Sequence, residues 1–437
     1  MGTRAAGQGR VAEIWCNLPR EKQGCPCAAG LRNTLAPDPG HAGVGSFSKP
    51  LSLARTVPLS ALTSIQMGST SQHFAILGAG LMGRLLALAL AQQGHRVQVY
   101  EAAAADAMGS AARAAAAMLA PLAESAVTEP SVVGMGLYSL SRWPQLIETL
   151  HQPVFFQQNG TLIVWHKPDE SEANRLHRHL ERTAAELPAL ERAQRLDAAA
   201  LTRTEPALAG RFAQGFYLPG EGQLDNRELL TALLAQLHSA GVSLHWHSPR
   251  KPEDFEPGAA GQPDWLIDCR GLGAQAAWRQ LRGVRGEVAR VYAPEVTLLR
   301  PLRLLHPRYP LYIAPKPDHV FVIGATEIES EDRSPVSVRS TLELLSAAYS
   351  VHSGFAEGRL LEMSAQLRPT LPDNLPALRW LGRRSLQVNG LYRHGFLIAP
   401  ALLDATLELL GSGQSALADR LGLSVQSATS APLPCRS

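Results

Sequence analysis

The chain has 437 residues, 45% of them hydrophobic and 18% charged, which is enough for a large core and two domains. Its 41 basic and 38 acidic residues give a net charge of +3, a balance that does not favour a nucleic-acid partner. No apolar run approaches the roughly 20 residues that a membrane-spanning helix needs. Composition therefore predicts a cytoplasmic protein with neither a nucleic-acid nor a membrane partner.

Residues 1–66 mix Gly, Pro, Ser and Ala without sustained periodicity. We interpret them as a disordered extension ahead of Met67 rather than a targeting segment, although residues 51–62 are weakly basic and amphipathic. The five cysteines do not form a disulfide framework. Cys25 and Cys27 lack a His/Cys pair at zinc-finger spacing, so no metal site is predicted and the thiols are expected to be reduced.

The stretch FAILGAGLMGRLLALALAQQGHRVQVYEA, residues 74–102, has the order strand, glycine turn, helix, strand. Gly78, Gly80 and Gly83 fit the spacing G-x-G-x-x-G. In such a turn the first glycine permits a tight bend, the second lets the backbone approach a pyrophosphate, and the third lets helix and strand pack closely. The stretch therefore predicts a dinucleotide-binding unit with a helix over residues 81–93.

The start of this helix and the end of the second strand predict contacts with the nucleotide. The N–H groups near Leu81 and Met82 are expected to hold the phosphates, because helix N-termini attract anions. Glu101 ends the second strand, where an acid accepts hydrogen bonds from ribose hydroxyls. An adenosine with a free 2′-hydroxyl indicates FAD or NAD rather than NADP.

The chain then departs from a plain doubly wound fold. Small residues fill 108–125, where they either let the backbone lie against a ligand or form an alanine-rich helix. Residues 155–166 predict β structure with a turn at Asn159-Gly160, and helices are predicted over 172–187 and after a cap at Asp225.

Two later stretches return to strand patterns. The apolar run 265–269, which ends in Cys269, leads to Gly271, as expected where the sheet returns to the nucleotide. LYIAP and HVFVIGATEIES flank a Pro-Lys-Pro-Asp turn and predict a hairpin of an antiparallel sheet. The nucleotide domain is therefore predicted to be interrupted by strands of another domain.

Five stretches, in this order, resemble the glycine oxidase and D-amino-acid oxidase family of FAD-dependent enzymes. The resemblance is greatest to the glycine oxidases that serve thiazole (thiamine) biosynthesis. It covers about residues 73–410 and rests on the glycine turn, AAAMLAPLAE (115–124), YIAP and VIGATEIES (312–330), LRPTLPDNLP (367–376) and GLYRHGFLIAPAL (390–402).

The resemblance implies an α/β fold with a discontinuous, Rossmann-type FAD-binding domain and an inserted α+β substrate domain built on an antiparallel sheet. The FAD-binding domain is expected over 67–145, 210–285 and 365–410. The substrate domain is expected over 146–209 and 286–364. Residues 411–437, rich in Ser, Ala and Pro, are expected to be a tail.

The resemblance also implies which residues surround the cofactor FAD. Those at the pyrophosphate and ribose are Gly78, Gly80, Leu81, Met82, Gly83, Glu101 and Ala102. Those on the flavin side are Ala111, Ala112, Ala116, Ala117 and Met118, with Gly271 at the returning strand. Those that close over the isoalloxazine and start the last helix are Leu391, Tyr392, Arg393, His394, Gly395, Phe396 and Leu397.

For the substrate, Arg368 matches the family arginine that binds the carboxylate, Tyr312 the tyrosine that assists it, and Arg393 a second pocket arginine. A guanidinium presents a bidentate fork to a planar carboxylate. The structural alternatives are an ion pair for Arg368 and an ordinary strand aromatic for Tyr312. Glu327 and Glu329 put acids beside the expected pocket strand.

The sequence also departs from the family pattern at several positions. Ala111 and Ala112 stand where hydroxyl residues are common, Ala117 replaces a frequent glycine, and Arg270 occupies a normally small position. These changes bear on the substrate more than on the binding of FAD.

The function implied is FAD-dependent oxidation of glycine or another small amino acid to its imine, with oxygen reduced to hydrogen peroxide, in support of thiamine biosynthesis. The alternatives are a D-amino-acid dehydrogenase that passes electrons to a quinone or other carrier, and a flavin-binding protein without turnover. The sequence leaves a homo-oligomer open.

Overall fold

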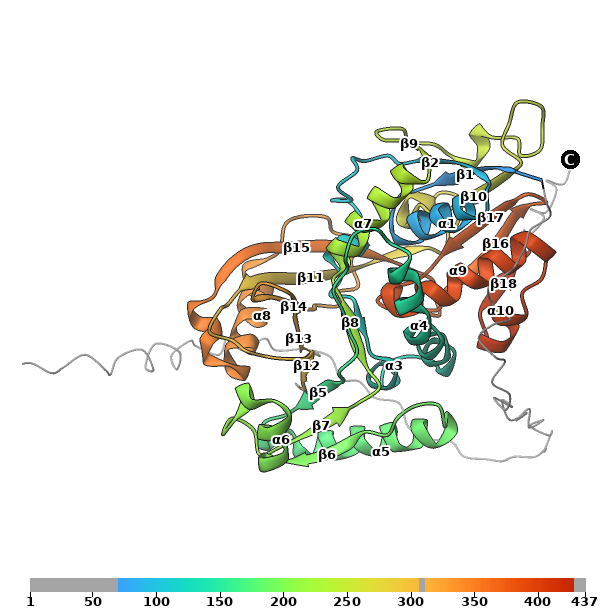
Figure 1. Cartoon of the computed structure of the whole chain (residues 1–437). Coiled ribbons are helices and arrows are strands. Elements are labelled where there is room, and N and C mark those ends of the chain that lie inside the picture. Colours follow the sequence, from blue (N-terminus) through green and yellow to red (C-terminus); the bar gives the residue numbers. More distant parts are fainter. Residues whose placement is uncertain (1–69, 306–310, 428–437) are drawn as a thin grey trace, which may run out of the picture. The chain divides into compact units, whose positions relative to one another are not determined.

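The computed structural model describes residues 70–305 and 311–427, all within one compact unit (Figure 1). The predictions for residues 1–66, and those for Cys25 and Cys27, lie outside the described residues. Cys269 is described and is a free thiol, as expected.

A seven-stranded sheet carries the glycine turn, and β1 (His73–Leu77) lies inside it. The chain passes from β1 to the parallel β2 (Arg96–Tyr100) on one side, while the parallel β10 (Trp265–Asp268) lies on the other. Ligands of open α/β sheets bind beyond the carboxyl ends of strands at such a switch in strand order. The full order is β18-β16-β17-β10-β1-β2-β9, with β9 Ser243–His245, β16 Ala377–Gly382, β17 Ser385–Asn389 and β18 Ser424–Gln426.

Helices share an apolar core with this sheet. α1 (Leu81–Gln92) follows the glycine turn, and α7 (Asn226–Ser239) starts where the Asp225 carboxylate accepts hydrogen bonds from two backbone N–H groups. α9 (Gly395–Ser412) lies beside α1 and α4 (Pro130–Glu148) in Figure 1. By length and composition α9 could cross a membrane, but most of it is buried, as expected of a central core helix.

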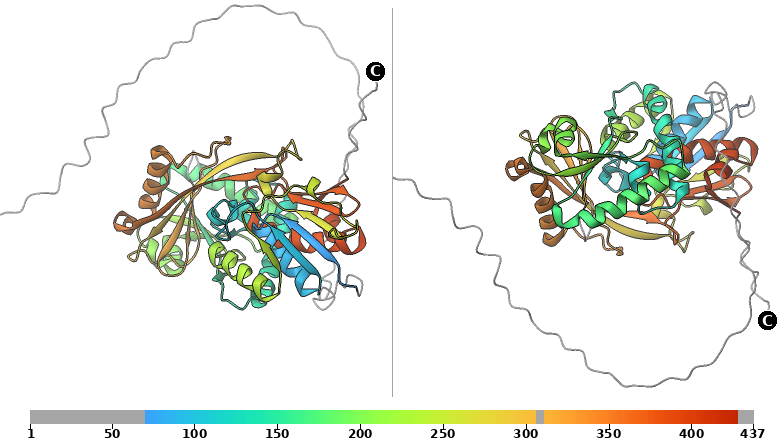
Figure 2. Two further views of the ribbon diagram at one scale, coloured as in Figure 1. Left: turned by 90° about the horizontal axis from the view of Figure 1, so that it is seen from above. Right: turned by 90° about the horizontal axis from the view of Figure 1, so that it is seen from below.

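An eight-stranded sheet forms the second layer and is antiparallel except where β5 pairs with β12. Figure 2 shows β11 and β15, its longest strands, side by side. α8 (Val338–Val351) and α5 (Glu170–Glu186) add apolar side chains to its two cores. The order is β15 (Arg359–Thr370), β11 (Arg282–Tyr292), β14 (Val320–Gly324), β13 (Leu311–Pro315), β12 (Leu302–Leu304), β5 (Thr161–Val164), β7 (Gln214–Leu218) and β6 (Gln194–Asp197).

A small sheet joins three segments that are distant in sequence. It contains β3 (Met118–Leu119), β8 (Gly222–Leu224) and β4 (Phe156–Gln157), with β8 in the middle. The turn at Asn159-Gly160 therefore does not close a hairpin, since β4 pairs with β8 whereas β5 pairs with β7 and β12. The remaining helices are α2 (Ala111–Ala114), α3 (Pro121–Glu124), α6 (Ala198–Thr204) and α10 (Ala416–Leu421).

The α/β fold with a second, largely antiparallel sheet is confirmed, but the sheets divide the chain differently from the predicted domain boundaries. β7 belongs to the eight-stranded sheet, although 210–285 was assigned to the FAD-binding domain. Residues 411–427 are not a tail, because they end α9, form α10 and add β18 to the edge of the seven-stranded sheet. β18 pairs with β16 through backbone hydrogen bonds, which leave little trace in the amino-acid composition of this segment.

Candidate active site

The geometry of the protein requires a glycine at two of the three glycine positions of the turn. Gly78 has φ +92°, and a Cβ on it would lie 2.8 Å from the carbonyl oxygen of Cys269. A Cβ on Gly83 would overlap the carbonyl oxygen of Gly78, so α1 packs onto the turn only without a side chain there. Gly80 is the N-cap of α1, and within the protein a Cβ on it would make only an ordinary contact, 3.4 Å from Ser110 Oγ.

Backbone donors and one carboxylate are ready for a nucleotide at this turn. Within the described ranges no residue accepts a hydrogen bond from the N–H of Leu81 or Met82. Glu101 Oε2 accepts a bond from Ala79 N at 2.7 Å, and its Oε1 accepts one from Ala103 N at 3.0 Å. These bonds fix the carboxylate beside the turn, while its remaining lone pairs stay available to ribose hydroxyls.

A buried arginine holds the turn from behind. Arg84 of α1 donates to the carbonyl oxygens of Ala79, Ala105 and Leu230 at 2.6–2.7 Å. Burial lowers the pKa of Arg84 to about 10, and the nearby acids Glu101 and Asp106 oppose that shift. The guanidinium therefore stays charged at neutral pH and ties the glycine turn to the loop after β2.

The alanine-rich segment is held by polar side chains from elsewhere in the chain. Its helical parts are the short α2 and α3, and Ser110 Oγ caps α2 by accepting a bond from Ala112 N at 3.2 Å. Asn226 Nδ2 donates to Ala112 O and Arg113 O at 2.8 and 2.7 Å. Ala117 has φ +52°, a left-handed backbone that suits the glycine common in the family.

Lys316 anchors the next part of this segment. Its buried ammonium donates to Ala116 O at 2.9 Å, Leu224 O at 2.7 Å and Gln223 Oε1 at 3.1 Å. Burial lowers the pKa of Lys316 to about 7. The lysine thereby joins the expected flavin-side residues to β8 and to the end of β13.

Arg368 stands on β15 with its guanidinium above Gly286 of β11. A Cβ on Gly286 would collide with that guanidinium, so the glycine makes room for it. Arg368 Nη2 donates to Thr326 O at 3.1 Å, and none of the described carboxylates forms an ion pair with Arg368. Burial lowers the pKa of Arg368, since its charge lacks a direct counterion. The structural alternative for Arg368, an ion pair with a carboxylate of the chain, is thus absent among the described residues.

Tyr312 lies near Arg368, and a second glycine makes room for it. It faces Gly324 across β13 and β14, and a Cβ on Gly324 would lie 2.7 Å from the phenolic oxygen of Tyr312. Burial raises the pKa of Tyr312, while Arg368 has the largest opposing effect. The phenol therefore stays protonated at neutral pH and can donate a hydrogen bond.

Arg393 belongs to the same site, but its guanidinium is already paired with carboxylates of the chain. Its Nη1 lies 2.7 Å from Glu327 Oε2, and its Nε lies 3.3 Å from Glu124 Oε2. Glu124 also pairs through Oε1 with Arg303 Nη2 at 2.5 Å. Burial would raise the pKa of Glu124, but Arg393, Arg303 and His394 together hold it well below its ordinary value.

His394 completes this group in its neutral form. Its Nδ1 lies 3.3 Å from Glu124 Oε2, and burial lowers the pKa of His394 to about 4. It precedes α9, so the amino end of that long buried helix also faces the site.

Sequence reasoning missed Glu124, Arg303 and Lys316. Glu124 closes the motif at 115–124 but carries no local sign of its role, and Arg303 and Lys316 reach the site from strands that come much later. The only sign of these three residues in the sequence is a charged side chain among apolar neighbours, and its meaning becomes clear only once the fold is known. Glu329, by contrast, pairs with Arg282 at 2.6 Å and is 68% exposed.

Arg270, the unexpected residue before Gly271, also receives a structural reason. Its Nε and Nη2 donate to the buried carboxylate of Asp268, each at 2.8 Å. Gly271 has φ +54°, and its carbonyl oxygen accepts a bond from Asn389 Nδ2 at 2.9 Å. Arg270 and Asp268 therefore fix the end of β10, where the sheet returns to the glycine turn.

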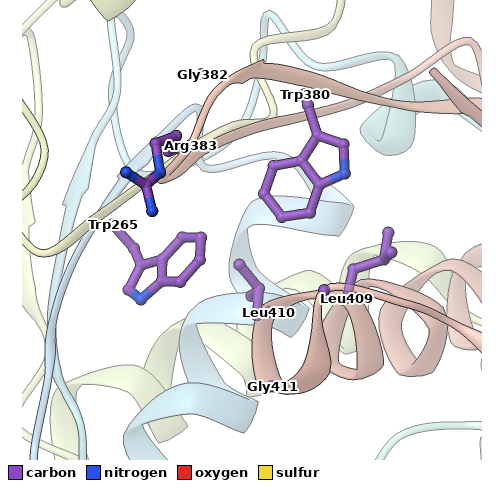
Figure 3. A pocket seen from close by; sticks show the side chains of 8 residues that line it. Trp265, Trp380, Gly382, Arg383, Leu409, Leu410 and Gly411 are labelled. Atoms are coloured by element: carbon purple, nitrogen blue, oxygen red, sulfur yellow. The ribbon is translucent and has the colours of Figure 1, made fainter. Parts of the chain in front are cut away.

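An open cavity of about 550 Å³ lies elsewhere (Figure 3). Trp265 begins β10, Arg383 precedes β17, and Leu410 is near the end of α9, so the cavity lies at the amino ends of the parallel strands. Nucleotides bind at the carboxyl ends. The predicted cofactor residues instead follow β1, β2 and β10, lie in α2 or around β3, or stand at the start of α9. The N–H groups of Leu81 and Met82 and the carboxylate of Glu101 fit the pyrophosphate and ribose of FAD.

Comparisons with known proteins agree with this geometry. The family model "FAD dependent oxidoreductase" (DAO) matches residues 73–407. The protein assigned as thiamine biosynthesis oxidoreductase ThiO of Rhizobium etli is 40% identical over 329 residues, 74% of this chain and 92% of its own length. Glycine oxidase of Geobacillus kaustophilus is 29% identical over 356 residues, 75% of this chain and 89% of its own.

Solved structures agree as well. The crystal structure of that Geobacillus kaustophilus glycine oxidase superposes with a TM-score of 0.67 at 25% identity, covering 79% of this chain and 96% of the other. Glycine oxidase of Bacillus cereus gives a TM-score of 0.66 at 20% identity, with the same coverage. The chain belongs to the DAO family of FAD-dependent oxidoreductases, and FAD is its cofactor.

Proposed function

We propose that the protein oxidises glycine, or another small amino acid, to its imine. The observation that carries this is Arg368, a partly buried guanidinium without a carboxylate partner among the described residues, next to the protonated Tyr312. A buried cation needs compensation, and a substrate carboxylate supplies it. Among amino acids, glycine is our leading candidate, because relatives at 25–29% identity are glycine oxidases.

In this proposal the residues of the chain bind and orient the substrate, and none of them acts as a general base. Arg368 would hold the carboxylate through two charge-assisted bonds, and Tyr312 would donate a third. Each oxygen of Glu124 lies within ion-pair distance of an arginine, and His394 is neutral with a pKa of about 4, so we assign neither as a general base. A substrate that enters as the neutral amine needs none.

FAD would supply the two-electron acceptor for the hydride that leaves Cα. The glycine turn, Glu101 and Ala102 would hold its pyrophosphate and ribose. Ala111, Ala112 and Ala116–Met118, together with the stretch 391–397, would surround the flavin. The N-terminus of α9 would stabilise negative charge on the reduced ring.

We further propose oxygen as the acceptor of the electrons, hydrogen peroxide as a product, and thiamine biosynthesis as the pathway that uses the imine. The Rhizobium etli relative, at 40% identity, supports the pathway. We also propose the cytoplasm as the compartment, on composition alone.

The decisive experiment is anaerobic bleaching of the flavin absorbance in the FAD-loaded protein. Glycine, sarcosine and D-alanine are added one at a time, and air is then admitted with a peroxide assay. We expect glycine to bleach the flavin and air to restore it with one peroxide per flavin. Bleaching that only a quinone reverses would indicate a dehydrogenase. A flavin that dithionite bleaches but no amino acid does would overturn the proposal.

A further inference from the structure

The charges around the candidate substrate site do not cancel. We call Arg303, Arg368, Arg393, Glu124 and Glu327 the charged cluster. It holds three guanidinium groups and two carboxylates, while the adjoining His394 is neutral. Within these five residues the excess is a single positive charge, and it falls on Arg368, since Arg303 and Arg393 each contact a carboxylate. The neighbouring Glu221 is not counted, because burial raises its pKa to about 7. One positive charge matches a substrate with one carboxylate.

Glu327 is the carboxylate of the cluster that can be substituted without disturbing the interior. It follows Thr326, whose carbonyl oxygen binds Arg368, and it reaches across to Arg393 at 2.7 Å. Its side chain is 41% exposed, whereas that of Glu124 is 9% exposed. Glu124 is therefore a fixed part of the interior, and Glu327 lies where the cluster meets solvent.

We infer that Glu327 is a specificity-determining residue that occupies Arg393 and thereby limits the substrate to one carboxylate. This inference rests on the proposed function, because it assumes that Arg368 binds the first carboxylate. A second carboxylate on the ligand would meet Glu327 as a like charge and would find Arg393 already paired. Small neutral substituents meet neither penalty.

Removing the charge of Glu327 should turn Arg393 into a second anion site. In Glu327→Gln the cluster keeps three guanidinium groups and one carboxylate, so its excess becomes two positive charges. Arg393 would retain Glu124 on its Nε, but its Nη1 would be free to bind a carboxylate. The variant should then favour ligands with two carboxylates, such as iminodiacetate, which is glycine with a second carboxymethyl group on nitrogen.

The test compares two ligands of equal length that cannot be oxidised. Glutarate has two carboxylates and pentanoate has one, and each is titrated into the oxidised FAD-loaded protein while the flavin spectrum is followed. We expect the affinity ratio of glutarate to pentanoate to rise roughly tenfold to a hundredfold in Glu327→Gln, the size of one charge-assisted hydrogen bond. Glu329→Gln is the matched control, because that acid pairs with Arg282 outside the cluster, and it should leave the ratio unchanged.

Turnover gives a second readout. Iminodiacetate should reduce the flavin of Glu327→Gln more efficiently relative to glycine than it does in the unaltered protein. An unchanged glutarate to pentanoate ratio in both Glu327→Gln and Glu327→Ala would overturn the inference, as would an equal rise in Glu329→Gln. The ligand ratio is measured without turnover, so it can stay unchanged while glycine still bleaches the flavin. The inference on Glu327 and the proposed glycine oxidation can therefore be refuted independently.

Discussion

The glycine turn and the charged cluster are built in opposite ways. At the turn, side chains are missing, and the absence of a Cβ on Gly78 and Gly83 lets backbone groups meet. In the cluster, long side chains from α3, β12, β15 and the stretch before α9 converge from distant parts of the sequence. The first site depends on backbone geometry, and the second depends on a balance of charges.

This difference decides which substitutions each site tolerates. A backbone site fails when any atom is added, because packed backbone cannot move aside. A charge site fails when one partner is removed, because the other is left buried and unpaired. The following predictions address first the turn and then the cluster, in order of decreasing effect.

Gly83→Ala should have the largest effect. The added Cβ would overlap the carbonyl oxygen of Gly78, so α1 and β1 could not keep their present packing. We expect protein that is purified without bound FAD or is insoluble. Gly382→Ala is the matched control, because a Cβ there meets nothing within 4 Å, the residue ends β16 away from the predicted cofactor residues, and FAD content should stay full. Full flavin occupancy in Gly83→Ala would show that the turn is not the nucleotide site.

Glu124→Gln should destabilise the protein strongly through the cluster. The change leaves Arg303 without its carboxylate and Arg393 with only Glu327. Breaking a buried ion pair costs about 3–5 kcal/mol. We expect that loss in the free energy of unfolding, measured by urea titration of the FAD-loaded protein.

The control for Glu124→Gln is Glu172→Gln, which removes an exposed pair with Arg175. Exposed pairs contribute about 0–1 kcal/mol. Equal losses in the two variants would mean that the buried cluster is not a distinct source of stability.

His394 should produce a smaller effect that depends on pH. Burial lowers the pKa of His394 to about 4, whereas the unfolded chain binds that proton near pH 6.5. Between these values the unfolded state binds more protons, so the free energy of unfolding falls as pH falls, by at most about 1.4 kcal/mol per unit. The contribution is fully present above about pH 6.5.

We expect His394→Gln to flatten the pH dependence of unfolding between pH 6.5 and 4.5. The charged groups that face this ring are Glu124, Arg393, Arg303 and Glu327, and none of them is altered by the substitution. Identical slopes in the variant and the parent would contradict a neutral, buried His394.

The same contrast explains how far sequence could predict this protein. The turn was readable because its glycines, helix and Glu101 are consecutive and each has a local steric or electrostatic reason. Arg368 and Tyr312 were found only through the family resemblance. Glu124, Arg303 and Lys316 were missed because their partners lie roughly a hundred or more residues away in sequence. β18 was missed because pairing at a sheet edge uses the backbone, which composition does not reveal.

The central claim is that Arg368 carries the uncompensated charge that binds the substrate carboxylate. The direct test is stopped-flow flavin reduction against glycine concentration in the unaltered protein, Arg368→Lys and Arg368→Ala. Each charge-assisted bond contributes about 1.5–3 kcal/mol, so Arg368→Ala should weaken substrate capture by roughly one to three orders of magnitude. Arg368→Lys keeps the charge without the fork and should fall between, with FAD content unchanged in both. An unaltered concentration dependence in Arg368→Ala would contradict the assignment of the carboxylate site.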